Sequence, residues 1–263
     1  MTYAELGDVR LFFTDEGTGR DPMLFVHGFT GDSNDWIWQL PHFASTCRVI
    51  AADLRGHGRS SEPSQGYDAA TFADDLARLL ARLGCGPVVA VGHSLGGLVV
   101  SALAVHHPAC VRAVVAIDPA YLVTATTLER VAPLLEALDD DDPVSVVQAM
   151  LAGADAASTP AFLRCWHVRR VAGLAPHVLR ETLAGMAGGA GSLTSGAAGQ
   201  DLLGRRRCPV LSVFTDPGRS AADQALFTDP RSRSVVWEGV GHSLHQERPD
   251  DLNRLVDAWL ASL

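Results

Sequence analysis

The sequence contains no lysine, so all 21 of its basic residues are arginine. Schiff-base chemistry, the anchoring of pyridoxal phosphate and the phosphate-binding loop of nucleotide hydrolases each need a lysine amine, so these chemistries are excluded. The five cysteines are widely scattered and form no C-x-x-C pair, which argues against a zinc site or a disulfide framework. We expect no metal and no organic cofactor.

Long apolar runs are also missing, since none approaches the roughly 20 residues that span a bilayer. The first residues show neither the basic segment nor the apolar segment of a secretory signal. The net charge of −9 argues against a nucleic-acid surface. We expect a cytoplasmic protein that acts on a small-molecule substrate, with no nucleic-acid or membrane partner and with homo-oligomerisation left open.

Hydrophobic residues are abundant, at 47% of the 263 residues, which is enough for one substantial core. Short apolar runs typical of parallel strands buried on both faces lie at Met23–Val26, Arg48–Ala52, Val88–Val91, Val114–Ile117, Val210–Phe214 and Ser234–Trp237. Val9–Thr14 alternates as an antiparallel strand does, and helical spacing marks Phe72–Leu83 and Leu252–Leu263. The alternation predicts an α/β fold with a mostly parallel, doubly wound sheet.

One interval, residues 121–207, breaks this alternation. It is rich in Ala, Leu and Gly, has helical spacing and contains no convincing strand. We expect a helical cap inserted into a core formed by residues 1–120 and 208–263. Met150, Phe162 and above all Trp166 are the candidates for lining a substrate pocket, although such residues also form the inside of a cap.

The most informative motif is Gly92-His93-Ser94-Leu95-Gly96, which lies between an apolar strand and an apolar helix. Small residues two positions before and after the serine allow a sharp turn that leaves its hydroxyl exposed. The motif therefore predicts that Ser94 is a nucleophile.

A serine nucleophile needs a base and a carboxylate that orients it. His242 follows the last predicted strand and is the expected base, with His245 as its local rival. Two carboxylates stand at the ends of predicted strands and come between serine and histidine in the chain: Asp118 directly follows Val114–Ile117, and Asp216 follows Val210–Phe214 after one residue. The order of residues along the chain does not show which of the two is the acid, because both fit the order Ser, acid, His.

These motifs resemble those of the α/β-hydrolase superfamily over nearly the full length of the chain. The resemblance is carried by four segments: His27-Gly28-Phe29, Asp53 to Ser60, the Ser94 motif, and Gly241-His242. Most members have the acid in a Gly-x-x-Asp turn after the penultimate strand, where this chain has Asp216 two residues early and glycine at the usual position. Some haloalkane dehalogenases and the zearalenone-type lactone hydrolases place it after the preceding strand, where Asp118 lies. Asp118 is therefore favoured, with Asp216 as the alternative.

Serine at the nucleophile position, in place of aspartate, argues against a dehalogenase or an epoxide hydrolase. The resemblance then implies hydrolysis of an ester or lactone of a small, moderately hydrophobic substrate through an acyl-Ser94 intermediate. The backbone N–H groups of Phe29 and Leu95 are the expected donors to the oxyanion. Two alternatives stay open: hydrolysis of a carbon–carbon bond in a β-diketone-like substrate, and a ligand receptor or lyase on the same fold.

Overall fold

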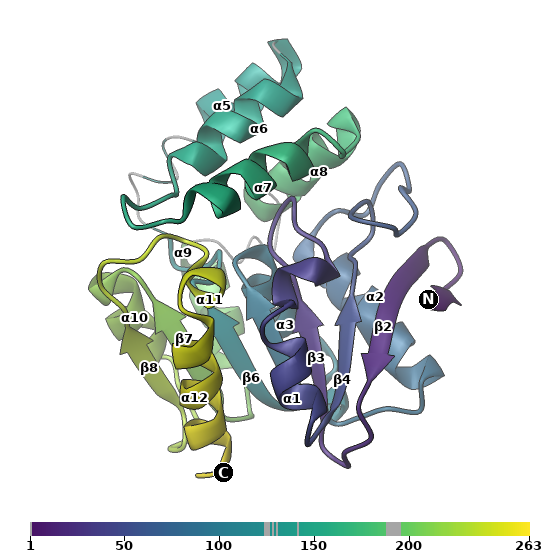
Figure 1. Ribbon diagram of the computed structural model, residues 1–263, viewed down its shortest axis with the longest axis vertical. Helices are drawn as coiled ribbons and strands as arrows, with labels where there is room; N and C mark the ends of the chain where they lie inside the picture. Colours follow the sequence, from purple (N-terminus) through teal and green to yellow (C-terminus); the bar gives the residue numbers. More distant parts are fainter. Residues whose placement is uncertain (1, 124–126, 128, 130, 141, 188–195) are drawn as a thin grey trace.

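The computed structural model describes residues 2–123, 127, 129, 131–140, 142–187 and 196–263. Its centre is an eight-stranded sheet with the order β1-β2-β4-β3-β5-β6-β7-β8 (Figure 1). The strands are β1 (Thr2–Glu5), β2 (Arg10–Glu16), β3 (Pro22–Val26), β4 (Arg48–Ala52), β5 (Val88–His93), β6 (Val111–Ile117), β7 (Val210–Phe214) and β8 (Arg233–Val236). Strands β1 and β2 pair antiparallel, and the other six run parallel. The predicted fold class is confirmed.

Helices cover both faces of the sheet and create two apolar cores. On one face, α2 (Ala69–Arg82) packs against α3 (Leu95–His106), and on the other lie α1 (Leu40–Ala44) and α12 (Pro249–Leu260). Asp68 caps the N-terminus of α2, and its carboxylate accepts hydrogen bonds from the N–H groups of Ala70 and Thr71. The remaining short elements of the body are η1 (Ser33–Trp36), η2 (Pro108–Cys110), α10 (Pro217–Gln224) and α11 (Leu244–Glu247).

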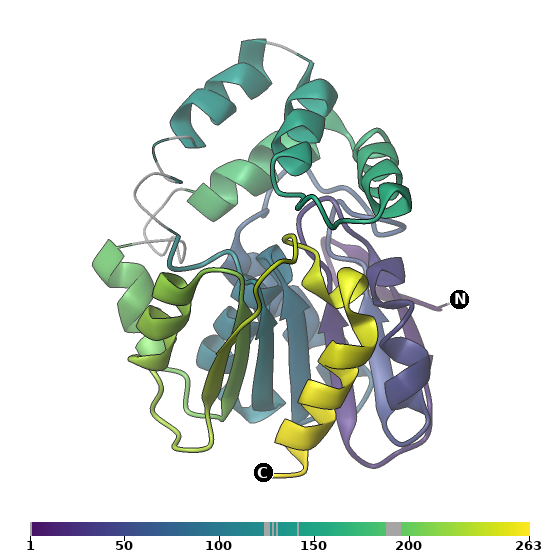
Figure 2. The same cartoon turned by 60° about the vertical axis from the view of Figure 1, so that its left-hand side comes forward.

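Between β6 and β7 the described residues form helices and no strand. These helices are α5 (Val131–Asp140), α6 (Pro143–Ala152), α7 (Ala161–Val171), α8 (Pro176–Ala187) and α9 (Gly196–Gly204). Helices α5 to α8 surround a small apolar core of their own and lie above one edge of the sheet in both views (Figures 1 and 2). Helix α9 instead packs against α3 in the main body.

The edge beneath α5 to α8 is the one at which the parallel strands end. Each of four neighbouring parallel strands is directly followed by one residue at this edge: His27 after β3, Ser94 after β5, Asp118 after β6 and Thr215 after β7. These four residues therefore gather at the same edge of the sheet. In α/β sheets this edge is where ligands bind. No helix in the described part of the chain is long and apolar enough to cross a membrane.

Candidate active site

Ser94 occupies a strained turn between β5 and α3. Its φ of 52° lies in the left-handed region, which side chains other than glycine rarely adopt. The flanking glycines allow this turn, because a Cβ at Gly92 would lie 2.2 Å from the carbonyl oxygen of Gly96, and a Cβ at Gly96 would lie 2.1 Å from that of Val26. The Ser94 N–H donates to the carbonyl of Ile117 at 3.0 Å, which fixes the turn to β6.

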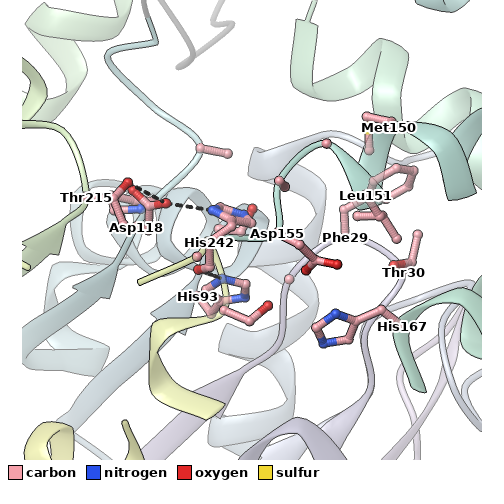
Figure 3. Close-up of a pocket in the computed structure, with 18 of the residues that line it drawn as sticks. Phe29, Thr30, His93, Asp118, Met150, Leu151, Asp155, His167, Thr215 and His242 are labelled. Atoms are coloured by element: carbon pink, nitrogen blue, oxygen red, sulfur yellow. Dashed lines mark hydrogen bonds and ion pairs between the residues drawn. The ribbon is translucent and has the colours of Figure 1, made fainter. Parts of the chain in front are cut away.

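His242 lies between β8 and α11 and is paired with Asp118. Nδ1 of the imidazole and Oδ2 of the carboxylate are 2.6 Å apart (Figure 3). A carboxylate only accepts hydrogen bonds, so Nδ1 carries the proton and Nε2 is left as the basic nitrogen. The His242 N–H donates to the carbonyl of Ala154 at 3.1 Å, so a residue between α6 and α7 holds the histidine segment.

Asp118 is almost completely buried and has three polar partners. Arg219 Nη1 donates to Oδ1 at 3.1 Å, while Oδ2 accepts from His242 and, at 3.4 Å, from the hydroxyl of Thr215. Burial alone would raise the pKa of Asp118, but the hydrogen bond and charge of His242 and the charge of Arg219 outweigh it, so the pKa lies below its ordinary value. The carboxyl group is therefore ionised at neutral pH.

Asp216 has a different place in the structure. It precedes α10, and its Oδ1 accepts the Arg219 N–H at 2.7 Å as an N-cap. It does not line the cavity that contains Ser94, His242 and Asp118. The structure thus brings Asp118, and not Asp216, to the histidine.

His245, the rival to His242, is hydrogen-bonded to no carboxylate in the part of the chain that the structure describes. Its ring lies 4.7 Å from that of Trp36 and 4.4 Å from that of His93, and neither ring nitrogen has a hydrogen-bond partner among the described residues. Burial lowers the pKa of His245 to about 3, so it is neutral at ordinary pH. Its ring packs against Trp36 and His93 and lines the cavity.

The Phe29 and Leu95 N–H groups donate no hydrogen bond within the described part of the chain. Leu95 is the first residue of α3, where the helix dipole favours negative charge. Phe29 follows a turn held by His27, whose Nδ1–H donates to the Gly28 carbonyl at 2.8 Å and whose Nε2 accepts the Leu54 N–H at 2.9 Å. That double contact fixes the turn and was not foreseen from the sequence, because it depends on the neighbouring strand β4.

A cavity of about 1020 Å³ lies between the strand ends and the overlying helices, and Ser94, Asp118 and His242 line it together. Met150 of α6 lines this cavity, next to Leu151 and Phe29 (Figure 3). Among the described residues, no group of three or more His, Cys, Asp or Glu side chains is placed to hold a metal ion.

Phe162 and Trp166 do not line the cavity, contrary to the prediction. They are 61% and 46% exposed on the outer face of α7. Leu163 and Val171 define the inner face of α7 and are buried, and the cavity-facing residues of this helix are His167 and Arg170. Helical spacing identified the helix but not which of its faces is covered.

Arg170 belongs to a buried polar network that sequence reasoning missed. Both its terminal nitrogens donate to the Asp35 carboxylate, which also accepts from Gln246 Nε2 at 3.0 Å. His167 Nε2 in turn donates to Gln246 Oε1 at 2.8 Å. Burial would raise the pKa of Asp35, but the Arg170 charge keeps it below its ordinary value. The network ties α7 to the main body.

Comparison with known proteins assigns this arrangement to a family. A family model described as the alpha/beta hydrolase fold matches residues 21–151. The chain is 29% identical over 263 residues to the dihydrolipoyllysine-residue acetyltransferase component of an acetoin cleaving system from Cupriavidus necator, covering 98% of this chain and 68% of that protein. It is 36% identical over 152 residues to 2-(acetamidomethylene)succinate hydrolase from Mesorhizobium japonicum, covering 57% of this chain and 54% of that one.

A solved structure described as an N-acyl homoserine lactone degrading enzyme superposes with a TM-score of 0.82 at 27% identity, covering 98% of this chain and 99% of that one. The matched segments of several curated relatives are shorter, and the chain covers only 54% of the length of the succinate hydrolase and 36% of a non-heme haloperoxidase from Rhodococcus erythropolis. Fold, site geometry and relatives agree: the chain belongs to the α/β-hydrolase superfamily.

Proposed function

We propose that this protein is a serine hydrolase that cleaves a carboxylic ester or a lactone through an acyl-Ser94 intermediate. One observation carries the proposal. Ser94, on its strained turn, shares a cavity with a histidine whose Nδ1 is bonded to a buried carboxylate at 2.6 Å, which leaves Nε2 as the free base. The lactone-degrading structural neighbour supports the same reaction class.

In the first half-reaction His242 Nε2 takes the proton of the Ser94 hydroxyl while the serine oxygen attacks the substrate carbonyl. Asp118 holds the imidazole in the required tautomer and stabilises the imidazolium that forms. The carbonyl oxygen becomes an oxyanion, which accepts hydrogen bonds from the N–H groups of Phe29 and Leu95, to which no described residue is hydrogen-bonded. The α3 dipole adds to this stabilisation.

The tetrahedral intermediate collapses when the C–O bond to the leaving alcohol breaks. His242 gives its proton to that alcohol, and the acyl group remains on Ser94 as an ester. His242 then removes a proton from water, and the resulting attack releases the acid and restores the serine. In a lactone the alcohol stays attached to the acyl chain, so both ends leave as one hydroxy acid.

We propose that helices α5 to α8 form the cap that selects the substrate. Met150, Leu151 and Phe29 supply apolar walls, which suits a small, moderately hydrophobic acyl group. A cytoplasmic location and the use of a small-molecule substrate without nucleic-acid or membrane partners remain part of this proposal. The two alternatives use the same cavity. A carbon–carbon hydrolase would turn over a β-diketone-like substrate, and a receptor would bind its ligand without turnover.

The decisive experiment measures the release of p-nitrophenol from short-chain p-nitrophenyl esters, beside proton release from lactones of different ring size. Steady turnover that is lost in Ser94→Ala, by about a millionfold in kcat if the triad acts as a unit, supports the proposal. A fluorophosphonate probe should label the wild type at Ser94 and leave the variant unlabelled. A single burst without turnover would favour the receptor, and activity on β-diketones alone would favour carbon–carbon hydrolysis.

A further inference from the structure

The two arginines among the described residues that line the cavity are already neutralised. Arg170 is bound to Asp35, and Arg219 is bound to Asp118. The two carboxylate side chains are each 4% exposed, and the Arg170 and Arg219 side chains are 13% and 15% exposed. An anionic substrate therefore finds no guanidinium in this lining that lacks a carboxylate partner.

Asp155 is a further carboxylate in the lining. Among the described residues its ion-pair partner is Arg164, whose Nε lies 3.8 Å from Oδ2 and whose side chain is 46% exposed, so the pair is long and open to solvent. The Arg164 guanidinium also contacts the backbone, since Nη2 donates to the Ala156 carbonyl at 2.7 Å. The described lining thus contains three carboxylates, of Asp35, Asp118 and Asp155, and two arginines.

The position of Asp155 is fixed relative to the catalytic histidine. The preceding residue, Ala154, accepts the His242 N–H through its carbonyl, and the following residue, Ala156, donates its N–H to Thr159 Oγ1 at 2.9 Å. Thr159 Oγ1 itself donates to Glu247 Oε1 at 2.8 Å.

Figure 3 shows the Asp155 carboxylate directed into the space between His242, Phe29 and His167.

From this arrangement we propose that Asp155 determines specificity by charge: it disfavours acyl groups that carry a carboxylate and favours those that carry an ammonium group. The inference rests on the proposed function, because it concerns the acyl group that Ser94 attacks. Two unlike charges a few ångströms apart near a protein surface attract each other, two like charges repel each other equally, and salt screens both effects. The cavity is thus suited to neutral or cationic esters and lactones.

The test compares kcat/KM for p-nitrophenyl esters that differ in acyl charge. The anionic substrate is the mono-p-nitrophenyl ester of adipic acid, with the neutral heptanoate as its reference. The cationic substrate is the ester of γ-trimethylammonio butyric acid, with its neutral tert-butyl isostere as its reference. Each ratio of charged to neutral substrate cancels any effect of a substitution on chemistry that both substrates share.

We expect Asp155→Asn to raise the ratio of anionic to neutral substrate about tenfold and to lower the ratio of cationic to neutral substrate by a similar factor. Both changes should shrink as salt rises from about 0.05 M to 0.5 M, because the side chain is partly exposed. Glu136→Gln, an exposed carboxylate of α5 outside the cavity lining, changes the net charge equally and should leave both ratios within twofold.

Two failures are distinguishable. If no ester or lactone is turned over, the proposed hydrolase function fails. If esters are turned over but Asp155→Asn leaves both ratios unchanged, or shifts them no more than Glu136→Gln does, the charge selection is overturned while the hydrolase function stands. A preference of the wild type for the adipate ester over heptanoate would overturn it as well.

Discussion

Arg219 donates through Nη1 to Oδ1 of Asp118 at 3.1 Å, on the oxygen that His242 does not use. The guanidinium also donates through Nη2 to the backbone carbonyls of Pro119 and Tyr121. These bonds fasten the turn in which Asp118 has a φ of 36°. Arg219 is thus a positioning residue for the carboxylate, and Asp216 begins the helix that presents it.

We expect Arg219→Met to lower kcat about tenfold and to move the acidic limb of the kcat pH profile upward by about half a unit to one unit. The guanidinium charge helps to hold the pKa of Asp118 below its ordinary value, so its loss raises that pKa and the carboxyl group that orients His242 takes up a proton at higher pH. The measurement is kcat against pH with a neutral p-nitrophenyl ester. Arg219→Lys should recover part of the shift. A lower rate with an unmoved profile would mean that Arg219 serves the fold alone.

Asp118→Asn and Asp216→Asn should separate the two candidate acids. Asp118→Asn leaves an amide that can donate to His242 Nδ1 and favour the wrong tautomer, so we expect kcat to fall by about four orders of magnitude. Asp216→Asn keeps a side-chain oxygen that can cap α10, so kcat should stay within about threefold. Steady-state kinetics at pH 7 measures both. Loss of activity in Asp216→Asn alone would assign the acid to Asp216.

The sheet was predictable because strands buried on both faces must be nearly all apolar, and the runs at β3 to β7 are. The positions of Ser94 and His242 followed from motifs whose chemistry depends on local backbone shape. Trp166 was misplaced because an amphipathic pattern does not say which face meets a cavity. The bonds from Asp35 to Arg170 join residues 135 positions apart, and no local pattern specifies such a pair.

Buried His245 should make stability depend on pH. Its folded-state pKa of about 3 lies below the ordinary value of 6.5, so between these values the unfolded chain binds more protons and stability falls as pH falls. We expect His245→Leu to flatten this decline, by at most about 1.4 kcal/mol per pH unit. Urea unfolding at several pH values from 4 to 7 measures it. His57, with a pKa of about 3, should keep part of the slope in the variant.

A parallel slope in wild type and His245→Leu would show that this histidine is not held neutral in the folded protein. His42→Leu is the matched control, because this histidine is exposed and bonded to Asp257 at the surface. Its removal should leave the decline between pH 6.5 and 4 in place. The comparison isolates burial as the cause, since both substitutions remove one imidazole.

The buried pair of Asp35 and Arg170 joins α7 to η1, and breaking it from one side should cost more than removing it from both. Arg170→Met leaves the Asp35 carboxylate with only Gln246 as a donor from that network, and Asp35→Leu leaves the buried guanidinium without its carboxylate partner. We expect each variant to lower the free energy of unfolding by about 3–5 kcal/mol. The double variant leaves no uncompensated charge and should recover much of the loss. Urea unfolding of all four proteins gives the coupling energy. Additive single losses would mean that the two side chains act independently, and that α7 is held to the body by its apolar contacts.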